Sequence, residues 1–348
     1  MNPILDIEDL AVSFASGGQV ASAVRGVSFD VAAGERIGIV GESGSGKSVT
    51  AQAIMRLLPS TAEVSGAIRF AGEDINTYDR KRLTRLRGAE IAMIFQDPMS
   101  SLNPLMRVGK QITETLRRHR GLGRSEAREE AIRLLRTVGI ADAEARMRDY
   151  PHAFSGGMRQ RVCIAIAASC APQLIIADEP TTALDVTVQG QVLDLLDKLT
   201  DDHGTAAILI SHDLGVVSSF CDRVLIMYAG RIVEVGPTER VVHAPQHPYT
   251  RALLDSIPRM DRDLPHRLPG IPGAPPQGAD DPEGCPFAAR CPRATQECLV
   301  SMPAMTPTSA ALAPSHAADP GATTGGPSAF ACFHPLGADA AEPLEVAR

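Results

Sequence analysis

The octapeptide GESGSGKS at residues 41–48 decides the fold, because its pattern Gly-x-x-x-x-Gly-Lys-Ser suits a phosphate-binding loop. Its glycines let successive backbone N–H groups turn towards phosphate oxygens. Lys47 places a cation on the β and γ phosphates, and the Ser48 hydroxyl faces Mg²⁺. An apolar strand is predicted at 36–40, before the loop, and a helix at 49–58, after it. Strand, glycine loop and helix in this order predict a nucleotide-binding α/β domain rather than an incidental glycine-rich turn.

An acidic strand end supplies the second half of such a site. The apolar run 174–177 is followed by Asp178 and Glu179. We expect Asp178 to hold Mg²⁺ through water and Glu179 to accept a proton from the attacking water. Without the phosphate loop, two acids at a strand end would be interpreted as exposed surface. Together, the two motifs predict nucleoside triphosphate hydrolysis.

Composition limits the class of protein. The chain has 348 residues, which suggests about two domains. It is 44% hydrophobic with only 4% aromatic residues and no Trp, so the core must be aliphatic. A net charge of −7 gives no electrostatic reason to expect nucleic-acid binding. Residues 1–14 lack a secretory signal, and no apolar run approaches the roughly 18–20 residues of a spanning helix. We therefore expect a soluble chain that reaches a membrane only through other subunits.

The order of elements along the chain indicates an interrupted α/β core. Further strands are predicted at 4–14 and 24–31, and a buried parallel strand at 206–210. Between about 97 and 153, Arg, Glu and Leu dominate, which predicts a helical insertion. Within it, the spacing of apolar residues predicts a helix over 125–138.

The start of that helix is predicted from its polar residues. Ser125 is a residue type that often caps a helix, with Glu129 and Glu130 following in the first turns.

The composition changes again after about residue 245. Pro, Gly and Ala become frequent, and the run 268–276 cannot form a helix or a central strand. Residues 303–329 are rich in Ala, Pro, Thr and Gly and are predicted to be a flexible loop. We place a domain boundary here, with one domain at 1–245 and an irregular extension at 246–348.

Four more motifs follow the phosphate loop in a recognisable order. They are FQDP at 95–98, FSGGM at 154–158, ALD at 183–185 and SHD at 211–213. With these motifs, residues 1–245 resemble the nucleotide-binding subunit of ATP-binding-cassette (ABC) transporters. The resemblance implies a P-loop NTPase fold, with a RecA-like core, an antiparallel β subdomain and a helical subdomain at about 97–153.

The resemblance also implies a role for each motif. Gln96 would contact Mg²⁺ together with Ser48 and Asp178, and would relay the state of ATP to the membrane subunit. His212 would contact the γ phosphate, beside the catalytic Glu179. Asp185, in the segment Ala183-Leu184-Asp185, would cross to a partner ATPase. The implied ATP-binding residues are Phe14, which would stack on adenine, and Gly41, Glu42, Ser43, Gly44, Ser45, Gly46, Lys47, Ser48 and Val49.

The segment 154–161, FSGGMRQR, corresponds to the family's signature. In the family, the signature residues Ser155, Gly156 and Gly157 contact the nucleotide of the facing subunit. The wider superfamily usually has Leu and Gln where this chain has Phe154 and Met158. The present form is also that of the peptide-importer branch.

The tail strengthens this resemblance. HPYTRALL at 247–254 and GCPFAARCP at 284–292 resemble the C-terminal extension of oligopeptide and dipeptide importer ATPases. The resemblance implies peptide uptake, a second and related ATPase subunit, two membrane permeases and an external binding protein. It places the chain at the cytoplasmic face of a bacterial inner membrane.

Three other functions share part of this pattern. The close alternative is an importer of nickel or another metal chelate, since these ATPases resemble one another. A chromosome-maintenance ATPase would need a long coiled coil, for which residues 49–153 are too few. A translation-associated cassette protein would carry two cassettes, and this chain has one phosphate loop.

The seven cysteines fall into two groups. Three have apolar neighbours and are predicted to be small core residues: Cys163, Cys170 and Cys221. Four lie in the tail with the pattern Cys-x5-Cys-x6-Cys followed by a distant cysteine, namely Cys285, Cys291, Cys298 and Cys332.

Four thiolates can hold Zn²⁺ or an iron–sulfur cluster. The spacing of the tail cysteines is wider than the Cys-x2–4-Cys of structural zinc sites, which favours a cluster. The family resemblance implies [4Fe–4S]. Zn²⁺ and no metal at all remain the alternatives.

Overall fold

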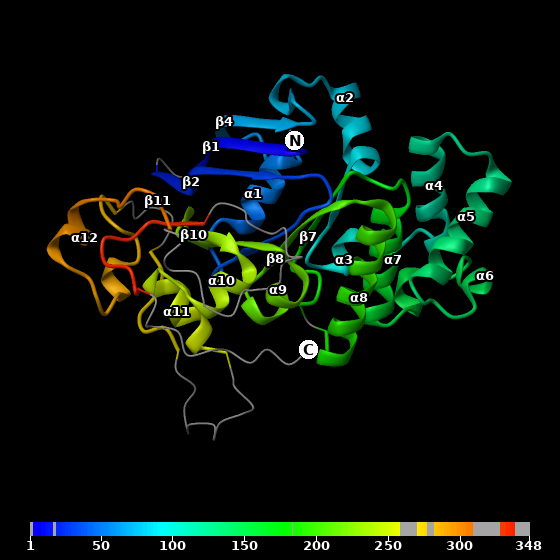
Figure 1. Ribbon diagram of the computed structural model, residues 1–348. Helices are drawn as coiled ribbons and strands as arrows, with labels where there is room; N and C mark the ends of the chain where they lie inside the picture. The colour runs from blue at the N-terminus through cyan, green and yellow to red at the C-terminus, as the bar shows by residue number, and fades with distance from the viewer. Residues whose placement is uncertain are drawn as a thin grey trace. The chain divides into compact units, whose positions relative to one another are not determined.

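A computed structural model describes residues 3–16, 19–182, 184–257, 270–276, 282–308 and 328–337 (Figure 1). The chain divides into two compact units, each formed from separate parts of the sequence. The first unit contains residues 1–6, 30–35 and 69–210, and the second contains 7–29, 36–68 and 211–348. The extension predicted from residue 246 onwards thus belongs to the same unit as the phosphate loop.

The strands of the described residues are β1 (Leu5–Ser16), β2 (Gln19–Val31), β3 (Arg36–Val40), β4 (Ala62–Phe70), β5 (Glu73–Asp74), β6 (Ile91–Ile94), β7 (Leu174–Asp178), β8 (Ala206–Ser211), β9 (Arg223–Tyr228), β10 (Arg231–Pro237), β11 (Thr306–Pro307) and β12 (Ala329–Phe330). The α-helices are α1 (Lys47–Ile54), α2 (Arg80–Arg85), α3 (Pro98–Ser101), α4 (Val108–Arg120), α5 (Arg124–Thr137), α6 (Ala143–Arg146), α7 (Gly156–Ala168), α8 (Val186–His203), α9 (Leu214–Phe220), α10 (Thr238–His243), α11 (Pro248–Asp255) and α12 (Gln296–Val300). Short helical turns are η1 (Ile75–Thr77), η2 (Leu86–Glu90), η3 (Pro151–Ala153) and η4 (Ala288–Arg290).

Three parallel strands form the sheet of the first unit. β7 pairs with β6 on one side, where Ile91 is opposite Leu174, and with β8 on the other, where Leu174 is opposite Ala206. Every residue of β7 and β8 is buried, as apolar runs in a parallel sheet should be. The predictions of buried parallel strands at 174–177 and 206–210 are confirmed.

The segment 97–153, predicted to be a helical insertion, contains helices α3 to α6. Figure 1 shows α4, α5 and α6 side by side. Helix α4 buries a stripe with four-residue spacing, Val108, Ile112 and Leu116, and α5 buries Ala127 and Ala131 in the same way.

The predicted cap of α5 and the predicted end of α1 are wrong. Helix α5 is capped by Gly123, whose N–H donates to the Glu126 carboxylate at 2.9 Å, whereas the Ser125 hydroxyl donates to Glu129. A glutamate at the third helical position competes well for that free N–H, so Ser125 lies inside the helix. The helix predicted at 49–58 is α1, which ends at Ile54 because Arg56 adopts the left-handed backbone conformation.

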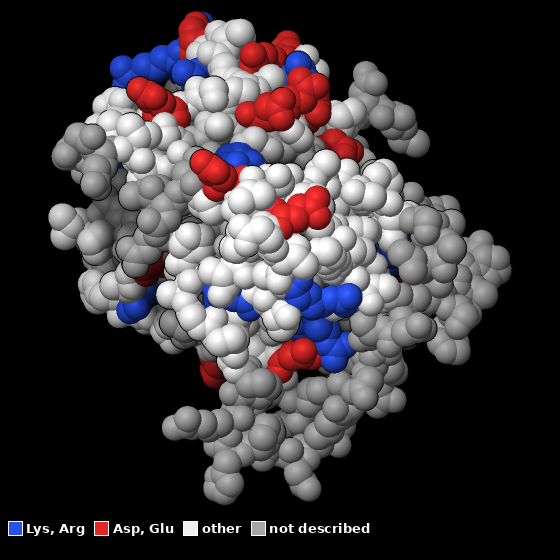
Figure 2. All heavy atoms as spheres, turned by 90° about the vertical axis from the view of Figure 1, so that its left-hand side faces the viewer, with Lys and Arg blue, Asp and Glu red and all other residues white. Residues whose placement is uncertain are grey.

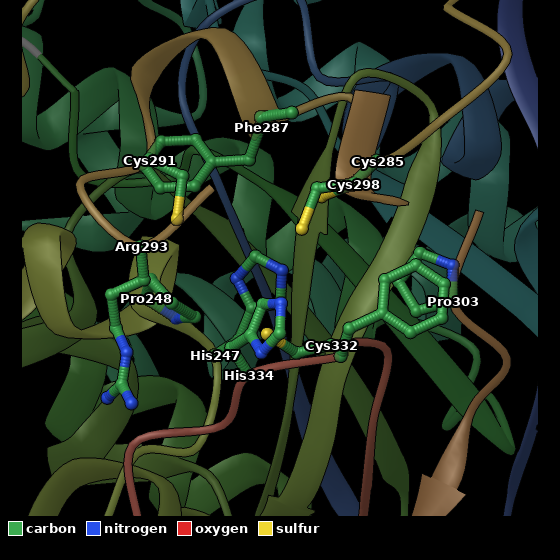
Figure 3. Close-up of a pocket in the computed structure, with 12 residues that line it drawn as sticks. His247, Pro248, Cys285, Phe287, Cys291, Arg293, Cys298, Pro303, Cys332 and His334 are labelled. Carbon is green, nitrogen blue, oxygen red and sulfur yellow. The ribbon is translucent and has the colours of Figure 1, made fainter. Parts of the chain in front are cut away.

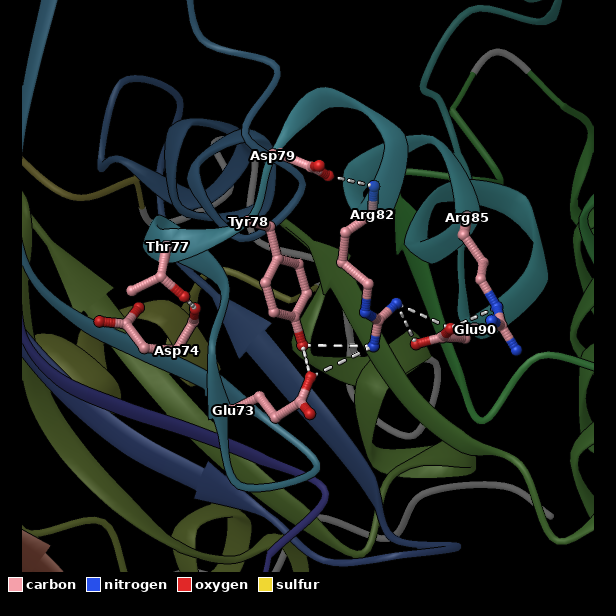
Figure 4. Close-up of polar contacts among 8 residues, drawn as sticks. All are labelled: Glu73, Asp74, Thr77, Tyr78, Asp79, Arg82, Arg85 and Glu90. Carbon is pink, nitrogen blue, oxygen red and sulfur yellow. Dashed lines mark hydrogen bonds and ion pairs between the residues drawn. The ribbon is translucent and has the colours of Figure 1, made fainter.

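A network of hydrogen bonds and ion pairs stabilises the segment that precedes β6 (Figure 4). The Arg82 guanidinium donates to both carboxylate oxygens of Glu90, at 2.8 and 2.9 Å. The Tyr78 hydroxyl donates to Glu73 at 2.6 Å, and burial together with this carboxylate raises the pKa of Tyr78 to about 12. The side chain of Arg82 also lies over the Tyr78 ring. The network joins β5, η1 and α2 to the start of the parallel sheet.

Replacing Arg82 tests the contribution of this network. Because Arg82 and Glu90 are only partly exposed and Arg82 Nη1 is shared between both oxygens of Glu90, Arg82→Ala should lower the free energy of unfolding by about 1 kcal/mol. The control variant is Arg80→Ala, which changes the first residue of the same helix. Equal stability of the two variants in chemical denaturation would show that the network contributes nothing.

The second unit contains a mixed sheet. β3 is parallel to β9, β9 pairs antiparallel with β10, and β10 pairs antiparallel with β12, which in turn pairs with β11. The short strands β11 and β12 lie on either side of residues 309–327, so most of the loop predicted at 303–329 lies outside the described residues. A separate sheet has the order β2-β1-β4-β5. This sheet contains the strands predicted at 4–14 and 24–31.

The core is mainly aliphatic, as the composition requires, and it includes a cluster of three aromatic rings. Tyr228, Tyr249 and Phe287 are fully buried, and their ring centroids lie 4.5–5.4 Å apart. On the face shown in Figure 2, acidic and basic side chains are interspersed among uncharged residues. Among the described residues, every helix is too short or too polar to span a bilayer.

The three cysteines outside the tail differ in burial. Cys163 and Cys221 are buried, and burial raises the pKa of both thiols, which confirms their core role. Cys170 is only half-buried and lines a hollow of about 450 Å³ beside α5 and α8, so its prediction as a core residue is wrong.

Candidate nucleotide site and cysteine pocket

The phosphate loop lies in the second unit, between β3 and α1. Lys47 is 5% exposed, and its ammonium donates to the backbone carbonyls of Gly41 and Glu42 at 2.8 and 2.9 Å. Two glycines are required by close packing. A Cβ on Gly41 would collide with the Met227 carbonyl, and one on Gly46, whose φ is 100°, would collide with a neighbouring carbonyl. The loop therefore has the tight, backbone-lined form that phosphate binding needs.

Helix α1 continues directly from the loop. No acidic residue occupies its first turn. Its free N–H groups and the positive end of its dipole therefore favour an anion at this end.

The acidic residues lie at the end of β7 in the first unit. Asp178 is 4% exposed and is opposite Ile210 of β8. Glu179 has a φ of 45°, a strained conformation for a residue other than glycine, and its N–H donates to the Ile210 carbonyl at 2.9 Å. Its carboxylate accepts hydrogen bonds from the Gln96 amide at 3.0 Å and from the Thr182 hydroxyl at 2.9 Å.

The structure thus brings Gln96 and Glu179 together, a contact that the sequence analysis did not predict. Gln96 follows β6 and Glu179 follows β7, so the two side chains meet because these strands are neighbours. Thr182 was missed by sequence reasoning. Its only signal was its position three residues after Glu179, in the turn that leaves the strand.

The signature segment starts α7. The Ser155 hydroxyl caps this helix by accepting a hydrogen bond from the Met158 N–H. Phe154 is 2% exposed, with the Arg146 guanidinium 5.7 Å from its ring. A Cβ on Gly157 would lie 2.8 Å from a Val188 methyl of α8, whereas Gly156 has open space around it. Phe154 therefore anchors the segment, and Gly157 allows α7 and α8 to approach.

Three remaining predicted residues lie in different places. Asp185 caps α8 by accepting from the Val188 N–H at 2.9 Å. Ala183, from the same motif, lies outside the described residues. His212 is exposed between β8 and α9, and Phe14 is half-buried in β1. Both residues belong to the second unit.

All four tail cysteines line one pocket of the second unit (Figure 3). Burial raises the pKa of the Cys332 thiol to about 11 and also raises that of Cys285 and Cys291. Among the described residues, no group of three or more His, Cys, Asp or Glu side chains has metal-binding geometry. The pocket therefore gathers the cysteines without forming a coordination shell.

The surroundings of the sulfur atoms fit an anionic, sulfur-bound group. Backbone N–H groups two residues further along lower the pKa of three of these thiols, against the larger effect of burial, which raises it. These pairs are Phe287 with Cys285, Arg293 with Cys291, and His334 with Cys332. Backbone N–H donors of this kind stabilise cluster and zinc thiolates.

His247 adds a further donor to the pocket. Its ring is buried and lines the pocket. Nδ1 accepts a hydrogen bond from the Tyr249 N–H at 3.0 Å, so the ring proton lies on Nε2. Nε2 has no partner among the described residues. An unsatisfied buried N–H beside four sulfurs fits a site for a negatively charged group.

A buried carboxyl group supports the same region. Glu234 of β10 is 3% exposed and accepts hydrogen bonds from the backbone N–H groups of Gln246 and His247, at 2.8 and 2.9 Å. Burial nevertheless raises its pKa to about 7. Sequence reasoning missed Glu234, because a lone acid in a strand gives no sign of its burial.

This raised pKa makes stability depend on pH. Between pH 4.5 and 7 the unfolded chain loses the Glu234 proton and the folded chain retains it, so stability should fall as pH rises through this window. Glu234→Gln lacks this titration. Its free energy of unfolding relative to the wild type should rise by about 3 kcal/mol between pH 4.5 and pH 8. Denaturant titrations measure this difference, and the exposed Glu239→Gln serves as the control. A difference that does not vary with pH would contradict the assignment.

The fold and these motifs define the class of protein. Residues 24–182 match the family described as "ABC transporter". A solved dimeric ATP-binding cassette, in a post-hydrolysis state bound to ADP and Pi, is 28% identical with a TM-score of 0.61, covering 67% of this chain and 98% of that one. The chain is an ABC ATPase.

Closer relatives define the branch. Residues 233–298 match the family described as "Oligopeptide/dipeptide transporter, C-terminal region". An oligopeptide transport ATP-binding protein of Salmonella typhimurium is 51% identical over 85% of this chain and 88% of that protein. A dipeptide transport ATP-binding protein of Bacillus subtilis is 49% identical over 88% of this chain and 92% of that protein. The chain belongs to the family of oligopeptide and dipeptide transporter ATPases.

Proposed function

We propose that this chain hydrolyses ATP to drive peptide import through an ABC transporter. The observation that carries the proposal is the matched C-terminal region, together with relatives at about half identity that are named for oligopeptide and dipeptide transport. The chain itself has the phosphate loop, the acidic strand end and the signature of an ATPase.

Each site residue has a proposed task. The loop residues 41–48 and Val49 bind the triphosphate, and Phe14 stacks on adenine. Ser48, Gln96 and Asp178 would hold Mg²⁺. Glu179 accepts the proton of the attacking water, held in place by its hydrogen bonds from Gln96 and Thr182. His212 contacts the γ phosphate.

The signature acts on a partner's nucleotide. Ser155, Gly156 and Gly157 contact the ATP bound by a facing ATPase subunit, and Asp185 lies in the segment that crosses to it. The dimeric form of the solved cassette supports this arrangement. We propose that the facing subunit is a related but different chain. Two permeases and an external binding protein complete a transporter at the cytoplasmic face of a bacterial inner membrane.

Replacing the proposed base tests the mechanism. Glu179→Gln keeps the hydrogen bond with Gln96 but cannot take a proton, so it should bind MgATP normally and lose at least about 100-fold in turnover. Nucleotide binding and phosphate release are measured on the same preparation. Glu239→Gln, an exposed acid far along the sequence, is the control. Wild-type hydrolysis in Glu179→Gln would refute the assigned role.

A metal–chelate importer remains the second candidate for the transported substrate, on the similarity of the ATPases. The identity of the ligand held by the external binding protein decides between the two. Peptide binding supports the proposal, and a nickel chelate supports the alternative.

We also propose that Cys285, Cys291, Cys298 and Cys332 hold a [4Fe–4S] cluster. The shared pocket, the backbone N–H donors and the N–H of His247 support this proposal. When bound, the cluster would link the segment that contains Cys285, Cys291 and Cys298 to the segment that contains Cys332. Zn²⁺ on the same four thiolates is the alternative.

Metal analysis tests the cluster. Anaerobically purified wild-type protein should contain about four irons per chain, with broad visible absorbance. Cys291→Ser should lose most of this iron, whereas Cys170→Ser, outside the pocket, should keep it. Stoichiometric zinc without iron would favour the alternative, and absence of both metals would overturn the metal proposal.

A further inference from the structure

The second residue of the phosphate loop faces the C-terminal extension. The Arg290 guanidinium forms a bidentate ion pair with the Glu42 carboxylate, in which Nη1 donates to Oε2 and Nη2 donates to Oε1 at 3.0 Å. The Arg290 side chain is 4% exposed and that of Glu42 is 26% exposed. This contact joins residues 248 positions apart in the sequence.

Arg290 is itself held rigidly. Its Nε donates to the Pro272 carbonyl at 2.8 Å, Nη2 donates to the Ile271 carbonyl at 3.2 Å, and Nη1 also donates to the Tyr228 hydroxyl at 3.1 Å. With these contacts and the two to Glu42, all five N–H groups of the guanidinium donate hydrogen bonds. A side chain fixed in this way can fix its partner.

A second contact reaches the same loop residue. The backbone N–H of Glu42 donates to the Tyr249 hydroxyl at 2.9 Å. Tyr249 is fully buried, and it packs against Tyr228 and Phe287. The Glu42 carbonyl in turn accepts from the Lys47 ammonium. The N–H and the carboxylate of Glu42 are thus both bound by the extension, and its carbonyl is bound by the loop lysine.

We propose that Arg290 and Tyr249 are positioning residues of the nucleotide site, which hold the phosphate loop in its binding conformation through Glu42. Neither residue touches the nucleotide. Both are contributed by the extension, so the extension forms part of the ATPase site. Because the first position of the loop packs against Met227 and Lys47 binds the Glu42 carbonyl, a shift of Glu42 moves the groups on either side of it. The inference rests on the proposed role of residues 41–48 in phosphate binding.

The test is nucleotide affinity, measured on the full-length chain with a fluorescent ADP analogue. Arg290→Ala and Glu42→Ala should each raise the dissociation constant about tenfold, as expected when a preorganised site becomes mobile. The double variant should also be about tenfold weaker, because both changes remove the same contact. Arg290→Lys keeps the charge without the fork and should recover only part of the affinity.

A control separates positioning from general stability. Arg251 and Asp255 form an exposed ion pair on α11, so Arg251→Ala should leave the dissociation constant unchanged. A folded Arg290→Ala protein with wild-type affinity would overturn the proposal, even if its melting temperature falls. A double variant about 100-fold weaker would also overturn it, because the residues would then act independently.

Milder variants cover the case in which Arg290→Ala does not fold. Tyr249→Phe removes only the hydroxyl that accepts from the Glu42 N–H, and Glu42→Gln keeps the shape of the side chain. Each should weaken binding about threefold, and wild-type affinity in both would contradict the proposal. Lys47→Ala tests the underlying site separately. If Lys47→Ala binds nucleotide normally, the proposed role of the loop is wrong, whatever Arg290 does.

Discussion

The close approach of the phosphate loop to neighbouring backbone is the constraint on which the rest of the second unit depends. Gly41 and Gly46 have no room for a side chain, because carbonyl groups occupy the space that a Cβ would need. The loop can therefore turn its amides inward only if β3, β9 and β2 keep their positions, because Met227 of β9 and Ala23 of β2 supply those carbonyls. The aromatic residues Tyr228 and Tyr249, packed below the loop, fix part of that arrangement.

In the first unit, the ends of two strands determine where the site residues lie. Parallel strands β6 and β7 end side by side, so the residues that follow them meet. Gln96 and Glu179 form a hydrogen bond for this reason, and Glu179 adopts the left-handed backbone conformation directly after the strand. The contact between these two side chains thus follows from sheet topology.

Much of this could be predicted from the sequence, because the signals are local. The loop glycines, the apolar run before Asp178 and the spacing of apolar residues in α4 and α5 each lie within a few residues of one another. The helix cap at Gly123 could not be predicted, because Ser125 and Glu126 offer competing caps of similar strength. The contacts of Glu42 with Tyr249 and Arg290, and the burial of Glu234, join distant parts of the chain and leave no periodic trace.

We propose that the C-terminal extension forms part of the ATPase site and that hydrolysis drives peptide uptake. The most direct test is ATP hydrolysis by the complete transporter, reconstituted in lipid with its permeases and binding protein. We expect hydrolysis to rise when the binding protein is loaded with peptide, together with peptide accumulation in the vesicles. Stimulation by a nickel chelate, with no response to peptide, would contradict the account.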